Sequence, residues 1–179
     1  MQSALDAALD QVVAGITAPG GALGVGTASV HGVTLPVFSA APPTMREYMA
    51  FFFAGQAEKE FLVFGEERLT FAGVYAKAMK FAAMLQHRHG IAKGDRVLIY
   101  MPMSIEAVVA MQACARIGAT HSVVFGGFSA KSVQERVIDA GAVAVITADG
   151  QVRGGKEIPL KPAIDEAIAL GGCEGVKSV

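Results

Sequence analysis

The sequence has few cysteines, no long hydrophobic run and no excess of either charge, and each shortage excludes a class of protein. Its two cysteines, Cys114 and Cys173, belong to no CxxC or Cys/His cluster, so neither a disulfide scaffold nor a structural zinc site is expected. We interpret them as a core residue and a loop residue in a reducing compartment, which predicts a cytoplasmic location. The apolar stretches are shorter than the roughly 18–20 residues of a membrane span. The first ten residues contain acids but no Lys or Arg, unlike a signal peptide.

The charges are nearly balanced, with 15 Lys and Arg against 16 Asp and Glu, a net charge of −1. Such a chain lacks the basic surface that nucleic acid or an anionic membrane requires, so we expect neither as a partner. Hydrophobic residues nevertheless make up 53% of the chain and charged residues only 17%. This composition predicts apolar faces that need covering, which leaves open a homo-oligomer, a complementing chain or a piece of a larger fold.

The chain is expected to divide into an N-terminal extension with a linker, residues 1–43, and a domain over residues 44–179. The run PGGALGVG interrupts regular structure from Pro19 to Gly26. The stretch from Val30 to Phe38 is typical of a strand, and Pro42-Pro43 marks the linker.

Two capping boxes predict helix starts in this half of the chain. Ser3 precedes Asp6 by three positions, and Thr44 precedes Glu47 by three. The first helix places its apolar residues on one face. These residues are Leu5, Leu9, Val12, Val13 and Ile16.

From residue 90 onward, short apolar segments alternate with helical patterns. The segments Arg96–Met101, Thr120–Phe125 and Val143–Thr147 are typical of strands that are buried on both faces. Between them lie predicted helices over Ser104–Ile117 and Ser129–Ala140. A further helix is expected near residue 162, and the final EGVKSV is expected to approach a fourth strand. This alternation predicts an α/β fold, a parallel sheet with helical crossovers.

In open parallel sheets, ligands bind beyond the carboxyl ends of the strands, and two loops there are candidates for a site. Gly126-Gly127 allows close approach of a ligand, and the helix that follows favours an anion. A tight turn that needs glycine for its dihedral angles is the favoured interpretation of this pair. In the second loop, DGQVRGGK, Arg153 and Lys156 flank two glycines and suit a phosphate group. A solvated loop is an equal alternative for this segment.

The remaining candidates are weaker. His87 and His89 are expected to cap a helix end, and His121 lies within a predicted strand. No Ser/His/Asp set and no metal cluster emerges. From the residues alone, the prediction is an α/β domain that binds a phosphorylated small molecule.

The stretch from Gly90 to Val179 resembles the acetyl-CoA and propionyl-CoA synthetases, AMP-forming acyl-CoA ligases of the adenylate-forming (AMP-binding) superfamily. The motifs that carry the resemblance occur together and in order: KGDRVLIYMPM, ACARIGA, HSVVFGGFS and DGQVRGGKEIPLK. Residues 3–86 are more similar to acyl-CoA ligases of the fatty-acid type, through APPTMREYMAF and FLVFGEERLTFAGVYAKAMKFAAML. Two subfamily patterns therefore meet near IAKGDRV.

The resemblance implies the N-terminal subdomain portion of the adenylate-forming fold. It also implies a reaction in which acetate or propionate, ATP and CoA give acyl-CoA, AMP and pyrophosphate. In this family the FGGF and VRxGR loops line the site for the 3′-phosphate adenosine end of CoA. The CoA-binding residues implied here are Phe125, Gly126, Gly127, Arg153, Lys156 and Ile158. Lys156 stands where the family usually has Arg, which keeps the charge but loses bidentate geometry.

No segment of the 179 residues resembles the Ser/Thr/Gly-rich loop that holds the ATP phosphates in this family. We therefore assign no catalytic or metal-binding residue, and the ATP and Mg²⁺ sites of the full-length family are not expected in this chain. The prediction is an N-terminal part of the ligase that carries part of the CoA site and is inactive alone. Two alternatives remain open: a non-catalytic CoA- or nucleotide-binding module, and a structural half-domain that needs a partner chain.

Overall fold

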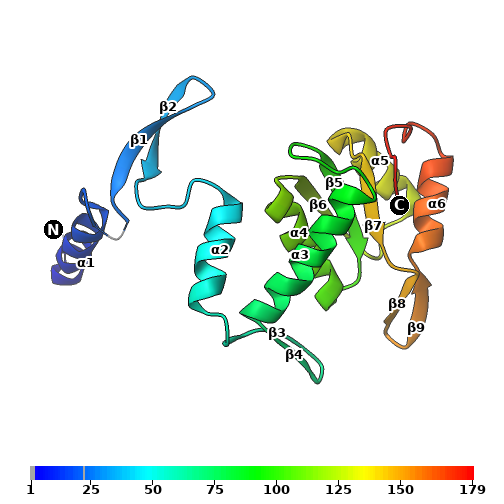
Figure 1. Cartoon of the computed structure of the whole chain (residues 1–179), viewed down its shortest axis with the longest axis horizontal. Helices are drawn as coiled ribbons and strands as arrows, with labels where there is room; N and C mark the ends of the chain where they lie inside the picture. The colour runs from blue at the N-terminus through cyan, green and yellow to red at the C-terminus, as the bar shows by residue number, and fades with distance from the viewer. Residues whose placement is uncertain (1–2, 22) are drawn as a thin grey trace. The chain divides into compact units, whose positions relative to one another are not determined.

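The N-terminal part of the chain forms a helix and a β-hairpin in the computed structural model, which describes residues 3–21 and 23–179 (Figure 1). The chain divides into two compact units, one ending at Tyr48 and the other spanning Met49–Val179. Helix α1 (Ala4–Thr17) begins at the predicted capping box, in which the backbone N–H of Asp6 donates to Ser3 Oγ at 3.1 Å.

The predicted strand over Val30–Phe38 is in fact parts of two strands. Strand β1 (Val25–Val30) pairs in antiparallel fashion with β2 (Val33–Phe38) across a two-residue turn. Both turn residues have positive φ, 49° at His31 and 81° at Gly32, as the tight turns that suit β-hairpins require. The prediction that regular structure is interrupted as far as Gly26 was wrong at its end, because β1 begins at Val25.

The apolar face of α1 is uncovered. None of the residues of this helix is buried, and the exposed fraction along the face runs from 37% at Ile16 to 67% at Leu5. The periodicity correctly predicted a helix with an apolar face, but the unit up to Tyr48 supplies no core for that face.

Helix α2 (Met45–Gly55) begins at the second capping box, where the N–H of Glu47 donates to Thr44 Oγ1 at 3.2 Å. It is followed by a hairpin of β3 (Glu60–Phe64) and β4 (Glu67–Thr70), and then by α3 (Phe71–His87). Buried side chains of α2 and α3 form a small aromatic cluster with this hairpin. Its buried members are Met49, Phe53 and Val74, packed against Phe61, Leu62, Leu69, Phe71, Tyr75 and Ala115.

The larger unit contains the predicted α/β fold with its parallel sheet. Strands β5 (Arg96–Met101), β6 (Thr120–Phe125) and β7 (Ala144–Thr147) pair in parallel in the order β6-β5-β7. Helices α4 (Ile105–Ile117) and α5 (Ala130–Ala140) form the crossovers, and α6 (Lys161–Ala169) follows β7 (Figure 1). The predicted approach to a fourth strand is confirmed as a single parallel bridge between Ala144 and Ser178.

The two crossover helices begin and end where their capping residues predict. Ser104 and Ser129 are N-caps whose side chains accept backbone N–H groups of the first turn. Gly118 and Gly141 end the helices with φ of 76° and 57°, the left-handed conformation that glycine adopts at least cost.

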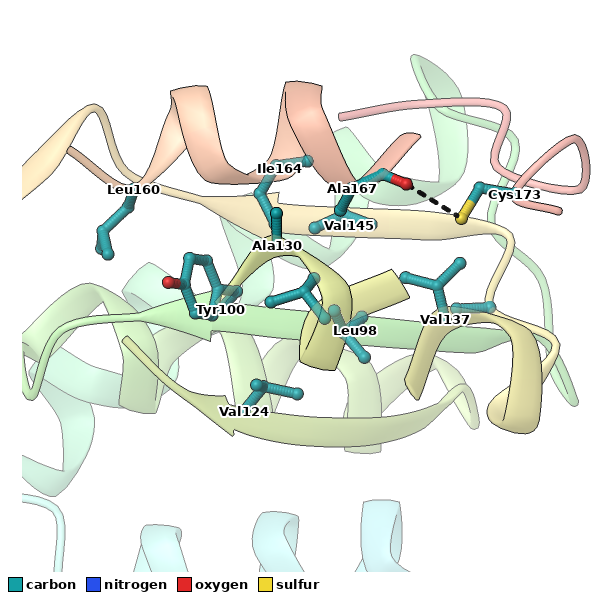
Figure 2. Packing of buried hydrophobic residues seen from close by; sticks show 12 residues of the cluster. Leu98, Tyr100, Val124, Ala130, Val137, Val145, Leu160, Ile164, Ala167 and Cys173 are labelled. Atoms are coloured by element: carbon teal, nitrogen blue, oxygen red, sulfur yellow. Dashed lines mark hydrogen bonds between the residues drawn. The ribbon is translucent and has the colours of Figure 1, made fainter. Parts of the chain in front are cut away.

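Alternate residues of β5 point to opposite faces, and each face is covered by a pair of helices. Val97 packs in a cluster with residues of α3 and α4, whereas Leu98 and Tyr100 pack in a cluster with α5 and α6. Figure 2 shows the second cluster, with Leu98 and Val145 from the sheet facing Val137 and Ala167 from the helices. The unit is thus three layered, and β5 is buried on both faces as predicted. The same prediction was wrong for β6, which lies at the edge of the sheet and leaves Val123 and Phe125 exposed.

Both cysteines are buried. Cys114 lies in α4, where burial raises the pKa of its thiol to about 11. Cys173 packs in the α5–α6 cluster and its Sγ–H points to the carbonyl of Ala167 at 3.9 Å (Figure 2). Cys173 lies in the loop after α6, as the sequence suggested, but its side chain is buried in the core.

Within residues 3–21 and 23–179, no helix has the length and apolar character needed to cross a membrane.

We expect Leu98→Ala to lower the free energy of unfolding by about 2–5 kcal/mol, because it leaves a cavity beside a fully buried strand. The matched control is Val123→Ala on the neighbouring strand, whose side chain is 55% exposed and whose loss is expected to cost less than about 1 kcal/mol. Urea denaturation of the three proteins measures both values. Equal losses for the two variants would contradict the core described above.

Candidate functional site

The carboxyl ends of the three parallel strands meet at one edge of the sheet. In the strand register, Met101 lies beside Phe125, and Tyr100 lies beside Thr147. The loops after β5, β6 and β7 therefore leave from the same edge, where ligands bind in open α/β sheets. This is the edge at which the sequence predicted a site.

Gly126 and Gly127 follow β6 directly and turn the chain sharply. The N–H of Gly127 donates to the carbonyl of Phe125 at 2.7 Å, and the N–H of Phe128 donates to the same carbonyl at 3.2 Å. Neither glycine has positive φ, so the interpretation that the turn needs glycine for its dihedral angles was wrong.

A lack of room for a side chain explains why glycine occupies these two positions. A Cβ on Gly126 would lie 3.0 Å from the carbonyl oxygen of Met101, and a Cβ on Gly127 would lie 2.8 Å from the Phe125 ring. The glycine pair therefore lets the turn pack closely against the end of β5 and against an aromatic side chain.

The segment DGQVRGGK is a hairpin rather than the flexible loop that was expected. Strand β8 (Gly150–Arg153) pairs in antiparallel fashion with β9 (Lys156–Pro159). Gly154 and Gly155 form a two-residue turn with φ of 57° and 73°, the combination that a type I′ turn requires. In this register Arg153 lies directly opposite Lys156.

One face of this hairpin carries all the predicted site residues of the segment. Residues directly opposite, and residues two apart on one strand, share a face. Arg153, Lys156 and Ile158 therefore lie together with Gln151, while Val152 and Glu157 belong to the other face. Val152 is 72% exposed, whereas Gln151 and Ile158 are half-buried and Ile158 packs against the α5–α6 cluster.

Arg153 connects the hairpin to the end of β6. Its guanidinium carbon lies 4.9 Å from the centroid of the Phe125 ring, a cation–π distance. A Cβ on Gly127 would lie 3.6 Å from Arg153 Nη1. The structure thus brings Phe125, Gly127 and Arg153 together, and Lys156 joins this group as the cross-strand neighbour of Arg153.

The two cations are not neutralised. No ion pair among the described residues involves Arg153 or Lys156, and both residues are exposed. Since Arg153 lies against an aromatic ring, its N–H groups remain available to a ligand at the ring's edge. The group can therefore bind an anion.

A second aromatic–arginine pair lies beside the first and was missed by sequence reasoning. The Phe128 ring meets the Phe125 ring at 5.9 Å and 72°, and the guanidinium of Arg136 lies 4.7 Å from the Phe128 centroid. The Tyr100 hydroxyl donates to the carbonyl of Phe128 at 2.8 Å. Phe128 is the last residue of the FGGF motif, and this position could have indicated that it lies at the site.

Two hollows lie at this edge of the sheet. One, of about 640 Å³, is lined by both strands of the β8–β9 hairpin, Ile158 among them. The other, of about 610 Å³, is a largely apolar groove formed by α3, α4 and the ends of β5 and β7. None of the six predicted residues lines this second groove, and of the six only Ile158 lines the first, so Arg153 and Lys156 lie outside both hollows.

The remaining candidates have structural surroundings. Nδ1 of His89 shares a hydrogen bond with Oγ of Ser178 at 2.6 Å instead of capping a helix, while His87 lies in the last turn of α3. Burial lowers the pKa of His121 on β6. Over residues 3–21 and 23–179, no group of three or more His, Cys, Asp or Glu side chains is arranged to hold a metal ion.

The sequence is similar to that of known proteins, and this similarity gives the family of the chain. Residues 51–175 match the family described as AMP-binding enzyme. The chain belongs to this family. It is 63% identical over 131 residues to the acetyl-coenzyme A synthetase of Burkholderia lata, 61% over 130 residues to that of Cupriavidus necator, and 56% over 131 residues to that of Burkholderia mallei. Each alignment covers 70% of this chain and 20% of the relative.

The comparisons confirm the resemblance to acetyl-CoA synthetases of this AMP-binding family. The aligned stretches are longer than the segment from Gly90 to Val179, so the similarity also reaches into the part that resembled fatty-acid-type ligases. The chain spans about a fifth of the length of these curated relatives.

We expect Gly126→Ala to lower the free energy of unfolding by roughly 1–3 kcal/mol, because the new methyl group would be forced against the backbone carbonyl of Met101. Gly55→Ala at the end of α2 is the matched control, since nothing lies within 4 Å of its Cβ position. Thermal unfolding followed by circular dichroism gives both changes. An unaltered stability for Gly126→Ala would show that the turn does not pack as described.

Proposed function

We propose that this chain carries the CoA-binding edge of an AMP-forming acetate- or propionate-CoA ligase. The observation that carries the proposal is the stacking of Arg153 on Phe125, with Gly127 beside them and Lys156 opposite on the hairpin. The motifs that resemble the family's CoA loops, FGGF at 125–128 and VRGGK at 152–156, have 23 residues between them (129–151), and Arg153 of the second lies against Phe125 of the first.

The cationic side of the site suits the 3′-phosphate of CoA. A guanidinium held flat on a ring presents a fixed set of N–H donors, which favours bidentate binding of a phosphate. The ammonium of Lys156 adds a point charge from the facing strand. Because neither cation is engaged in an ion pair within the described residues, phosphate binding does not first require an internal pair to break.

The apolar side of the site suits the adenine ring. The Phe125 ring is 47% exposed, so a planar base has a surface on which to pack. Gly127 is exposed and presents backbone without a side chain, which allows a close approach, while Gly126 is buried behind it. Ile158 contributes an apolar side chain from the same hairpin face as the cations.

Anchoring the adenosine end of CoA would serve the second step of the ligase reaction. In such a ligase a carboxylate and ATP first give an acyl-adenylate and pyrophosphate, and the CoA thiol then attacks the acyl carbon, breaks the acyl–phosphate bond and releases AMP. Binding the distant nucleotide holds the thiol near its target and lowers the entropic cost of that attack. The small-molecule substrates are CoA, ATP and a short-chain carboxylate, and the cytoplasm is the proposed location. ATP and Mg²⁺ have no residues assigned in this chain.

We expect the chain to bind CoA at least tenfold more tightly than 3′-dephospho-CoA, because a charge-assisted hydrogen bond contributes about 1.5–3 kcal/mol. Arg153→Ala should remove most of this preference and leave the part that the charge of Lys156 supplies. Arg136→Ala is a matched control: it removes an arginine that also stacks on a phenylalanine but lies outside the proposed site. Isothermal titration calorimetry with both ligands gives the constants. An Arg153→Ala variant that keeps the full preference, or an Arg136→Ala variant that loses it, would contradict the assignment.

We expect the 179-residue chain to give no ATP–pyrophosphate exchange above background with acetate, propionate or a medium-chain acid. The reason is that no segment resembles the loop that binds the ATP phosphates in the family. The assay follows radiolabelled pyrophosphate into ATP, after circular dichroism has shown that the sample is folded. Exchange by the purified chain would contradict the proposal that adenylation needs residues outside these 179.

A further inference from the structure

Tyr100 is a buried tyrosine that bonds to the end of the glycine turn. It lies on β5, the central strand of the parallel sheet, and its side chain is 1% exposed within the α5–α6 cluster (Figure 2). Its hydroxyl donates to the carbonyl oxygen of Phe128 at 2.8 Å. A carbonyl can only accept, and burial raises the pKa of Tyr100, so the hydroxyl stays protonated as the donor. The bond therefore joins the central strand to the FGGF turn.

The glycine turn is held at both of its ends. At its start, Phe125 is the last residue of β6 and pairs with the end of β5. At its end, Tyr100 binds the carbonyl of Phe128, directly before the N-cap of α5. Between these two points lie Gly126-Gly127, and glycine has the greatest backbone freedom of any residue. The hydrogen bonds within the turn run back to the carbonyl of Phe125 and do not reach the central strand.

The position of the turn determines how the Phe125 ring lies. The Phe128 ring meets it edge to face, with 5.9 Å between the two centroids. The backbone of the turn contacts the same ring, since a Cβ on Gly127 would lie 2.8 Å from it. The guanidinium of Arg153 lies over the Phe125 ring. A displaced turn would therefore move the ring that the proposed site offers to adenine.

We propose that Tyr100 is a positioning residue for the CoA site, whose hydroxyl holds the FGGF turn in the conformation in which the Phe125 ring receives the adenine. This inference rests on the proposed function and adds a residue to it. Because Tyr100 is buried, it acts through Phe128 rather than by touching the ligand. A turn that is ordered before binding lowers the entropic cost of binding. Without the hydroxyl the binding-competent fraction falls, and the apparent dissociation constant rises by the same factor.

The test compares Tyr100→Phe, which removes the hydroxyl and keeps the ring, with the unaltered chain by calorimetric titration of CoA and of 3′-dephospho-CoA. We expect both dissociation constants to rise by the same factor, about two- to tenfold, as the loss of one hydrogen bond of ordinary strength allows. Both ligands carry the adenine, so the preference between them should persist. Tyr75→Phe is the matched control: it removes the hydroxyl of a tyrosine in the aromatic cluster of α2 and α3 and should change neither constant.

A second variant separates the donor from the shape of the side chain. Tyr100→p-aminophenylalanine replaces the hydroxyl by an amino group that also donates, and it should bring both constants back to within about twofold of the unaltered chain. A role confined to stability would lower the melting temperature of Tyr100→Phe but leave both constants unchanged where the variant is folded. That outcome would overturn the inference, as would a p-amino variant that binds no better than Tyr100→Phe.

A measurement on the unaltered chain does not depend on the folding of any variant. Without ligand, the backbone amides of residues 126–128 in the ¹⁵N-labelled chain should give heteronuclear NOE values as high as those of β5, because the turn is already ordered. Low values that rise when CoA is added would overturn the inference. A loss of affinity confined to CoA in Tyr100→Phe would assign the effect to the cations and would also overturn it. If the unaltered chain bound neither ligand, the proposed function itself would fail.

Discussion

Strand β5 is hydrogen-bonded along both edges and buried on both faces, and the candidate site depends on its position. Its parallel pairing with β6 and β7 aligns the carboxyl ends of the three strands. Its alternating side chains hold α3 and α4 on one face and α5 and α6 on the other. Because parallel strands require crossover connections, the loops that carry the site all leave at the same edge. A slip of β6 by one residue would take Phe125 away from Met101 and would reverse the faces of its side chains.

The parts of the fold that sequence predicted well are those with a strong local cause. Arg96–Met101 and Thr120–Phe125 were predicted with their observed bounds, since a short apolar run between polar turns fits a parallel strand. Which strand would lie at the edge, as β6 does, depends on the order of the strands in the sheet. Ser104 and Ser129 cap their helices because a serine hydroxyl accepts the free N–H groups of the first turn. These signals act over a few residues and do not depend on distant contacts.

The misjudged parts depend on pairing or on contacts between distant segments. Both missed hairpins turn on two residues with positive φ. His31-Gly32 was predicted to lie within one strand, and Gly154-Gly155 within a loop. The role of Gly126 and Gly127 could not be predicted because the atoms that exclude a side chain come from Met101 and Phe125. The membership of the site residues was implied by family resemblance, while their spatial relation required the structure.

The hairpin tip joins two like charges by the shortest connection that a hairpin allows. Arg153 and Lys156 face each other across Gly154 and Gly155, and like charges directly opposite on paired strands repel. This repulsion therefore destabilises the hairpin without ligand, and a bound dianion would relieve it. Dissolved salt would screen the same repulsion, so ionic strength stabilises the empty tip while it weakens the attraction for phosphate. Occupancy of this edge should consequently fall with rising salt more steeply than one exposed cation would produce.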